Sequence, residues 1–251
     1  MQRYFIPAEH WNKDYVTIKG KDVHHISRVM RMEIGSSIVC IHPHDGPALT
    51  KIENITEESI SCNIVEWLDE DRELPVDVTV AQSLGKGDKL ELVVQKGTEL
   101  GAARFIPYAA DRSVAKWDHK KAKKKVERLQ KISKEASEQS ERSFIPEVTP
   151  LHSLKELMEI EGYDWCFFGY ADEARQRSST SLKTRLSKVK TGDKVLVVFG
   201  PEGGFSENEV QQFRASGFLS VRLGPRILRM ETAPFYFLSS LSYQLEENEG
   251  D

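Results

Sequence analysis

The sequence contains no apolar run that approaches the roughly 20 residues that a helix needs to cross a bilayer. Its first residues also lack the long apolar segment of a secretory signal peptide. Cysteine is scarce, and Cys40, Cys62 and Cys166 lie far apart within apolar runs, which argues against a disulfide framework. These absences predict a globular protein of the cytoplasm with buried, reduced thiols.

Two nucleotide-binding motifs are also missing. No G-x-x-x-x-G-K-[ST] segment is present, so the chain has no lysine and hydroxyl cradle for a triphosphate and magnesium. Neither Gly85–Gly87 nor Gly200–Gly204 completes G-x-G-x-x-G, which weakens a dinucleotide interpretation. His42 and His44 flank a proline beside Asp45, but no further ligand stands at a usual spacing. A turn is therefore favoured there, and no metal is expected.

The 251 residues, 39% of them hydrophobic, suffice for two domains with apolar cores. Residues 1–72 consist of short alternating or β-branched runs, which predict a small β-barrel or sandwich followed by an acidic linker at Leu68–Pro75. The predicted strands are Tyr15–Lys19, Ser37–His42, Ala48–Asn54 and Ser59–Glu66. One amphipathic helix interrupts these strands. Its apolar stripe comprises Val23, Ile26, Val29 and Met30.

Residues 73–251 instead alternate strand-like and helix-like segments, which predicts a parallel α/β domain. Val195–Phe199 is an apolar run without alternation, as is typical of a strand covered on both faces. Ser206 stands three residues before Glu209, the spacing of a capping box that begins a helix. The other predicted elements are strands at Val76–Ala81, Phe105–Tyr108, Trp165–Gly169 and Phe218–Leu223, helices at Lys89–Leu100, Lys120–Gln139 and Phe235–Leu245, and a polar loop at Ala171–Thr180.

Two loops rich in glycine and proline follow strands in this second half. Gly200–Gly204 follows the first apolar strand, and Gly224–Ala233 follows the second. In open α/β sheets ligands bind outside the carboxyl ends of strands, so these loops are expected to line one pocket. Because the triphosphate and dinucleotide motifs are absent, the remaining candidate is a nucleoside-bearing ligand without a pyrophosphate, held mostly by backbone groups.

Basic residues gather in two places, although the net charge is −4. Lys116–Lys134 holds nine Lys or Arg against two acidic residues. A solvated helix face and an RNA footprint explain such a concentration equally well. The same two interpretations apply to the basic residues off the stripe of the N-terminal helix. These residues are His24, His25, Arg28 and Arg31.

The pairing of FGPEGGFSENE at Phe199–Glu209 with LGPRILRMETA at Leu223–Ala233 resembles the RsmE family, the ribosomal RNA uridine-N3 methyltransferases of the SPOUT superfamily. The resemblance extends over nearly the whole chain, through HHISRVMRMEIG, QKGTELG, RSV and EASEQSERSFIPEV at residues 24–35, 95–101, 112–114 and 135–148. It implies a PUA-like RNA-binding β-barrel over residues 1–72 and a SPOUT α/β domain with a trefoil knot over residues 73–251. It also implies S-adenosylmethionine as methyl donor, 16S ribosomal RNA of the small subunit as substrate, and a homodimer, which an apolar C-terminal helix permits.

The loops and the resemblance together give the candidate site. The residues expected to bind S-adenosylmethionine are Phe199, Gly200, Pro201, Glu202, Gly203, Gly204, Leu223, Gly224, Ile227, Leu228, Arg229, Thr232 and Ala233. The residues expected to bind RNA are His25, Arg28, Arg31, Arg112, Lys120, Lys121, Lys124 and Arg142. For Arg142 a structural role at the end of a helix is an equal alternative.

Glu202 is the predicted general base for the proton on uridine N3, and Glu231 is its alternative. An enclosed, partly apolar pocket is expected to raise the pKa of the Glu202 carboxyl, although a structural role in which it accepts loop amides fits equally. Arg229 is expected to stabilise negative charge on the uracil oxygens. Two other functions remain open, an RNA-binding module without catalysis and a dinucleotide-dependent oxidoreductase.

Overall fold

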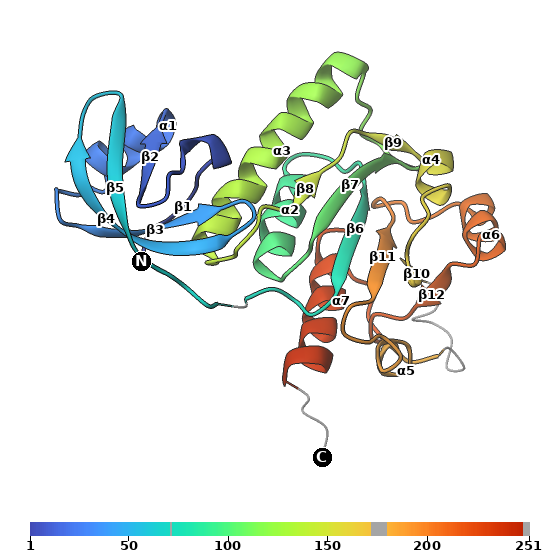
Figure 1. The fold of residues 1–251 in the computed structure, drawn as a ribbon. Coiled ribbons are helices and arrows are strands. Elements are labelled where there is room, and N and C mark those ends of the chain that lie inside the picture. Colours follow the sequence, from blue (N-terminus) through green and yellow to red (C-terminus); the bar gives the residue numbers. More distant parts are fainter. Residues whose placement is uncertain (71, 172–179, 248–251) are drawn as a thin grey trace. The chain divides into compact units, whose positions relative to one another are not determined.

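The computed structural model of the chain describes residues 1–70, 72–171 and 180–247 (Figure 1). The chain divides into two compact units, Met1–Glu73 with Ser137–Ile145, and Leu74–Ala136 with Pro146–Asp251. The first unit is thus built from two separate stretches of chain. The polar loop predicted at Ala171–Thr180 lies, apart from its two end residues, outside the described residues.

In the described part of the first unit, five strands form one sheet in the order β1-β3-β4-β5-β2. β1 pairs with β3 in parallel, and the remaining pairs are antiparallel. The strands are β1 (Arg3–Phe5), β2 (Tyr15–Lys19), β3 (Ser37–His42), β4 (Gly46–Ile55) and β5 (Ser59–Trp67). Alternate apolar side chains of these strands pack with Ile26 into one small core. The predicted strands are confirmed, and β1 adds to them.

The N-terminal helix differs from its prediction. α1 (Lys21–His24) passes directly into a π-helical turn, His25–Val29. Because the wider turn rotates the later side chains away from the core, Val29 and Met30 are 58% and 37% exposed. The predicted stripe is therefore wrong for its last two members. Arg31 follows in the left-handed region with φ 49°, which is uncommon for a residue with a side chain.

The second unit contains a sheet of parallel strands in the order β12-β10-β11-β6-β7-β8, with β9 also paired to β7. The strands are β6 (Asp77–Ser83), β7 (Arg104–Ala109), β8 (Glu147–Val148), β9 (His152–Ser153), β10 (Trp165–Gly169), β11 (Lys194–Phe199) and β12 (Leu219–Val221). The predicted parallel α/β architecture is confirmed. Of the predicted strand Phe218–Leu223, only Leu219–Val221 pairs with β10.

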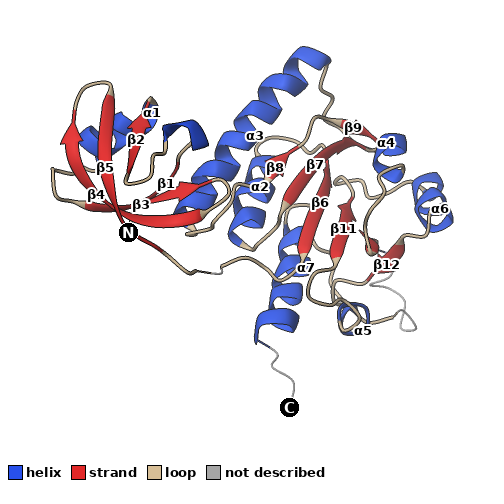
Figure 2. Cartoon of the chain, viewed as in Figure 1, coloured by secondary structure: helices blue, strands red, loops and turns tan. Residues whose placement is uncertain are grey.

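β11 lies inside the sheet between β10 and β6, which explains its unbroken apolar run. Its side chains alternate between two apolar cores, one on each face of the sheet. Helices cover both faces (Figure 2). The helices of the first core are α2 (Lys89–Glu99), α3 (His119–Gln139), α5 (Leu182–Leu186) and α7 (Thr232–Ser242), and those of the second are α4 (Leu154–Met158) and α6 (Glu207–Ala215). Each buried Val or Leu contributes roughly 1.5–3 kcal/mol, so the strands form a rigid base for the loops at their ends.

The predicted capping box of α6 is confirmed. The Ser206 hydroxyl accepts the Glu209 amide at 3.1 Å, and the Glu209 carboxylate accepts the Ser206 amide at 2.7 Å. The buried Glu209 also accepts the backbone amide of Asp111 at 2.9 Å. The start of α6 therefore fixes the loop after β7, which carries Arg112.

Cys40 and Cys62 are buried free thiols as predicted, whereas Cys166 is only half-buried. No described helix combines the length and the apolar composition that a membrane crossing requires.

The histidine segment after β3 forms the predicted turn. His42 Nδ1 accepts the backbone amides of His44 and Asp45 at 3.3 and 3.0 Å. Within residues 1–70, 72–171 and 180–247, no group of three or more His, Cys, Asp or Glu residues is arranged to hold a metal.

Candidate active site

Three loops meet at the carboxyl ends of β6, β11 and β12. Residues 84–88 follow β6, residues 200–206 follow β11, and residues 222–231 follow β12. A Cβ atom on Gly85 would lie 2.6 Å from Met230 Sδ and 3.7 Å from Glu202 Oε1. The three loops therefore touch around Gly85, where a side chain would have to displace the end of the Met230 side chain. Gly85 lies two residues beyond the end of β6, and its position in the loop after a strand is the one signal that could have identified it.

A lysine from α2 joins the two predicted carboxylates. Lys89 Nζ lies 2.9 Å from Glu202 Oε1 and 3.7 Å from Glu231 Oε2. The backbone amide of Lys86 donates a further hydrogen bond to Glu202 Oε1, at 3.3 Å. The two candidate bases thus share one ammonium group, which no pattern in the sequence identifies.

The expectation of a raised pKa at Glu202 is wrong. Partial burial does raise the pKa of this carboxyl, but hydrogen bonds from the Lys89 ammonium and from the backbone amides of Glu202 and Lys86 outweigh it. The pKa therefore lies below its ordinary value of 4.5. The same hydrogen bond raises the pKa of the Lys89 ammonium above 10.5. Glu202 is consequently an ionised partner of Lys89 at neutral pH.

Glu231 has a different environment. Its side chain is 15% exposed, and the Oε2 atom is buried without a hydrogen-bond partner among the described residues. The distance of 3.7 Å to Lys89 allows Coulombic attraction but is too long for a hydrogen bond. A buried carboxylate oxygen in this state is costly, so it is a place where a ligand donor would be favoured.

The loop after β11 is held by its own backbone and by side chains of neighbouring strands. The Tyr108 hydroxyl donates to the Phe199 carbonyl at 3.0 Å, and Gln82 Nε2 donates to the Gly200 carbonyl at 3.4 Å. Within the loop, the Gly204 amide donates to the carbonyl of the buried Pro201 at 2.9 Å. The loop is therefore a defined structure before any ligand binds.

The loop after β12 combines half-buried positions with exposed side chains. Leu223, Gly224 and Leu228 are half-buried, whereas Ile227 is 58% exposed and Arg229 is also exposed. At its end, the amides of Thr232 and Ala233 donate to the Arg229 carbonyl at 3.0 and 3.1 Å and begin α7. The structure therefore brings the backbone of Arg229 to this loop but leaves its side chain in solvent.

Arg112 reaches the loop after β11 from the neighbouring strand end. Its Nη1 donates to the Gly203 carbonyl at 3.1 Å, and the side chain remains exposed. A Cβ atom on Gly203 would lie 3.3 Å from Arg112 Cβ. This predicted RNA-binding residue is thus part of the wall beside Glu202.

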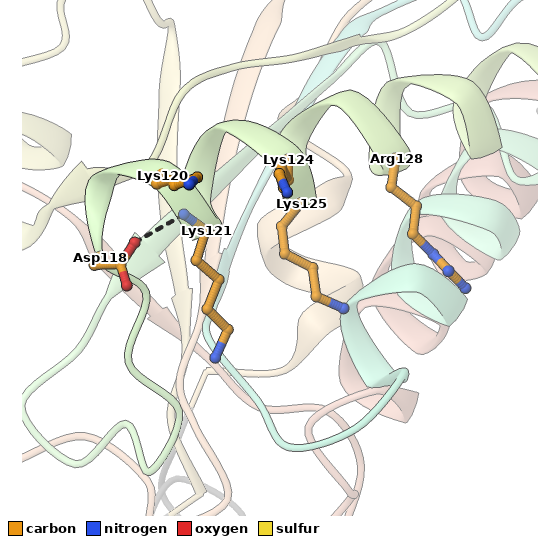
Figure 3. Close-up of a pocket in the computed structure, with 6 residues that line it drawn as sticks. All are labelled: Asp118, Lys120, Lys121, Lys124, Lys125 and Arg128. Carbon is orange, nitrogen blue, oxygen red and sulfur yellow. Dashed lines mark hydrogen bonds between the residues drawn. The ribbon is translucent and has the colours of Figure 1, made fainter.

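The first half of α3 forms a basic surface. Lys120, Lys121 and Lys124 are exposed and line a pocket of about 440 Å³ together with Asp118, Lys125 and Arg128. Figure 3 shows Lys121, Lys125 and Arg128 extending from one side of the helix, and the Asp118 carboxylate accepting the Lys121 amide at the helix start. Two of these cations share one carboxylate, because Glu91 binds Lys125 at 3.3 Å and Arg128 at 2.6 Å.

In the first unit, two predicted RNA-binding residues are exposed. Arg28 lines a pocket of about 560 Å³ with residues that include His24, and Arg31 is exposed beyond the π-helical turn. His25 is half-buried instead, and its Nδ1 lies 3.0 Å from the Tyr4 hydroxyl, with which it forms a hydrogen bond. His25 is therefore less available to RNA than the two arginines.

The prediction that Arg142 binds RNA requires correction. Its side chain is only 3% exposed, and its guanidinium group binds the Glu73 carboxylate at 2.5 Å. The same carboxylate accepts the Ser143 amide at 2.9 Å. Because this pair lies inside the first unit, Arg142 has the structural role that was its alternative.

Two family models match the chain. An RNA methyltransferase domain matches residues 72–242, and an RNA methyltransferase PUA domain matches residues 18–65. These matches define the class of protein, an RNA methyltransferase with an N-terminal PUA domain. The predicted PUA-like and SPOUT domains are thereby confirmed, whereas the trefoil knot stays a prediction.

Individual relatives narrow the class. The chain is 45% identical to the ribosomal RNA small subunit methyltransferase E of Bacillus subtilis over the whole of both chains. It is 31% identical to the enzyme of that name from Synechocystis sp., over 92% of this chain and 74% of the relative. A crystal structure of ribosomal RNA small subunit methyltransferase E from Neisseria gonorrhoeae, bound to S-adenosyl methionine, superposes with a TM-score of 0.84 at 25% identity, over 97% of this chain and 98% of that one. The chain therefore belongs to the ribosomal RNA small subunit methyltransferase E family.

Proposed function

We propose that this chain methylates N3 of a uridine in 16S ribosomal RNA of the small subunit, with S-adenosylmethionine as the methyl donor, in the cytoplasm. The main support is the meeting of three strand-end loops around a pair of carboxylates, in a chain of this methyltransferase family. The dinucleotide-dependent alternative has no comparable support. The inactive RNA-binding alternative is disfavoured because both glycine-containing loops and the carboxylate pair are present.

The strand-end loops fit S-adenosylmethionine. Their half-buried positions offer backbone N–H and C=O groups rather than polar side chains, as a nucleoside-bearing ligand held by backbone requires. The buried Oε2 atom of Glu231 can accept a hydrogen bond from an N–H group of a bound ligand, the uridine N3–H included. When bound, S-adenosylmethionine supplies a methyl group on an already activated sulfonium leaving group. The residues proposed to hold it are the thirteen cofactor-binding candidates from Phe199 to Gly204 and from Leu223 to Ala233 named above.

The protein's own task is to expose the uracil and to remove its N3 proton. The base edge is accessible only in unpaired RNA or in a nucleotide flipped out of its helix. Glu202 and Glu231 are the carboxylates beside the loops that could take the proton, and the exposed Arg229 would move to the uracil oxygens on RNA binding.

The RNA is proposed to bind two separate basic surfaces, one in each unit. In the first unit these are Arg28 and Arg31, and in the second Arg112 with Lys120, Lys121 and Lys124. Each exposed cation that neutralises a phosphate releases counterions, which gives a salt-dependent affinity without base readout.

We further propose a homodimer in which the exposed side of α7 contacts a second copy. Phe237, Leu238 and Leu241 of α7 are buried in the intramolecular core, whereas Tyr236 and Tyr243 are 36% and 65% exposed. Tyr236 belongs to α7, and Tyr243 begins the π-helical turn Tyr243–Glu247 that continues it. Because they are seven residues apart, the two tyrosines lie near one side of this helical segment. Sedimentation of the protein at micromolar concentration tests this, and a monomer there contradicts it.

The reaction is tested on small ribosomal subunits and on free 16S ribosomal RNA from a strain that lacks this protein. Each is incubated with the protein and S-adenosylmethionine, and the nucleosides are analysed by mass spectrometry. We expect N3-methyluridine to appear with at least one of the two substrates. RNA binding without any new methylated nucleoside would instead support the inactive module, and methylation at another atom would contradict the proposed position. Calorimetry with S-adenosylmethionine and NAD provides the control for the oxidoreductase alternative.

A further inference from the structure

Lys89 occupies an unusual position for a cation. It is the first residue of α2, where the partial positive charge of the helix N-terminus disfavours another positive charge. The preceding Asp88 makes no side-chain capping bond that would offset this. Two carboxylates from other strand ends do offset it, since Glu202 and Glu231 are the charged side chains that face the Lys89 ammonium. The position of Lys89 is therefore explained better by a role in the site than by a role in stabilising the helix.

The two carboxylates are not equivalent. Glu202 Oε1 is bound by the Lys89 ammonium at 2.9 Å and by the Lys86 amide at 3.3 Å. Glu231 Oε2 has no hydrogen bond among the described residues and remains buried. The buried acceptor without a hydrogen bond is thus Glu231 Oε2, whereas Oε1 of the more exposed Glu202 is already engaged.

We propose that Lys89 is a positioning residue for the reaction: it binds Glu202 and leaves Glu231 Oε2 as the acceptor of the uridine N3 proton. This inference rests on the proposed function. The N3–H bond breaks as the proton bonds to Glu231 Oε2, and the N3 electron pair becomes available for a bond to the methyl carbon, whose bond to the donor sulfur would break with its electron pair left on the sulfur. Glu231 later returns the proton to solvent.

Charge explains why the ammonium is needed. With Lys89 present, the two carboxylates and one ammonium carry a net charge of −1, which proton uptake by Glu231 reduces to zero. Without Lys89, two carboxylates near the same site would repel, and one of them would hold a proton before the substrate binds. The unprotonated acceptor would then be present only at higher pH.

The test compares Lys89→Met with Lys96→Met. Lys96 lies on the same helix and binds the Glu99 carboxylate at 2.8 Å, away from the strand-end loops, so its replacement removes a similar ion pair. We measure the single-turnover rate against pH on the ribosomal substrate, and we titrate the carboxyl groups of Glu202 and Glu231 by NMR. In Lys89→Met the acid limb of the rate profile and the carboxyl titration are expected to move up by about 1–3 pH units. A nearby opposite charge usually shifts the pKa of a carboxyl group by this amount.

The rate at the wild-type optimum is expected to fall roughly a hundredfold in Lys89→Met, as for a misplaced catalytic group, and to stay near normal in Lys96→Met. Lys89→Arg keeps the charge and is expected to restore the wild-type acid limb, which separates a charge effect from misfolding. If the wild-type protein is active but Lys89→Met and Lys96→Met have the same acid limb and the same carboxyl titration, the proposed role of Lys89 is wrong. The proposed function would still stand. A wild-type protein that leaves uridine N3 unmethylated overturns the proposed function as well, while the NMR titration still reports whether Lys89 controls the carboxylates.

Discussion

The basic surface of α3 and the strand-end loops both concentrate charge, but the charges have different surroundings. On α3 the side chains of Lys120, Lys121 and Lys124 extend into solvent, where their fields are screened within about 8 Å at physiological salt. At the strand ends, Lys89 lies between two partly buried carboxylates at fixed distances. The contribution of the α3 surface to RNA binding should depend on the number of its charges. The contribution of the strand-end loops to the reaction should depend on the position of a single charge.

The same contrast separates the two carboxylates within the strand-end region. Glu202 accepts two donors at Oε1 and is held ionised, and Glu231 retains a buried acceptor atom. Substitutions that keep shape while removing charge can therefore rank the two residues.

The largest effect is expected for Glu231→Gln. The amide keeps the size of the side chain but cannot take a proton, so the single-turnover rate should fall roughly 10²- to 10⁴-fold. Glu202→Gln should lose less, about tenfold to a hundredfold, because it disturbs the position of Lys89 rather than the proton acceptor. Quench-flow methylation assays at saturating RNA and S-adenosylmethionine measure both. The opposite ranking would return Glu202 to the role of general base.

A smaller effect is expected when the loop after β12 is strained. Gly224 has φ 78°, a conformation that a β-branched residue adopts only with strain, and its Cβ atom would lie 3.4 Å from the Tyr236 hydroxyl. Gly224→Val should therefore weaken S-adenosylmethionine binding by about tenfold to a hundredfold in calorimetry.

Gly217→Val is the matched control for that change. Gly217 has φ 82° in the turn between α6 and β12, and its Cβ atom would meet no other atom within 4 Å. It should cost comparable folding stability while leaving cofactor affinity unchanged. Equal loss of affinity in both variants would mean that strain anywhere in the unit, rather than the loop itself, controls binding.

Charge reversal on the α3 surface should weaken RNA binding gradually, by a similar amount for each lysine. Reversing Lys120, Lys121 and Lys124 to Glu should weaken RNA binding and reduce the slope of log affinity against log salt by roughly one for each phosphate that is no longer neutralised. Cofactor affinity should not change. Lys155→Glu, on the exposed surface of α4, is the control for each single reversal, because it changes the net charge by the same amount as one of them. A slope unchanged by the triple reversal would identify the lysines as a solvated helix face.

The sequence predicted features that depend on neighbours in the chain. Two patterns were sufficient to predict their elements. They are the unbroken apolar run of β11 and the spacing of Ser206 and Glu209 at the start of α6. β1 was missed because three residues paired in parallel with a distant strand leave no periodic pattern. The placement of Ser137–Ile145 with the first unit was missed for the same reason.

The candidate site shows the same limit. The glycine-containing loops are recognisable by their composition and by their position after strands. Lys89 is not, because its partner Glu202 is 113 residues away in the chain. The raised pKa expected for Glu202 was wrong because that expectation considered enclosure of the carboxyl without the ammonium group beside it.

Arg142 should have the smallest effect on RNA binding of the changes considered, although it counted among the basic candidates. Its guanidinium is enclosed with Glu73 inside the first unit, so removal of the charge does not alter a surface that RNA can reach. Arg142→Met should instead lower the free energy of unfolding of this unit by about 3–5 kcal/mol, because it leaves the Glu73 carboxylate without its main cation. At a temperature where the variant is still folded, its RNA affinity and salt slope should equal those of the wild-type protein, in contrast to Arg28→Glu and Arg31→Glu. A reduced salt slope for folded Arg142→Met would show that this arginine leaves Glu73 to bind phosphate, and that burial in the free protein does not exclude a residue from the RNA surface.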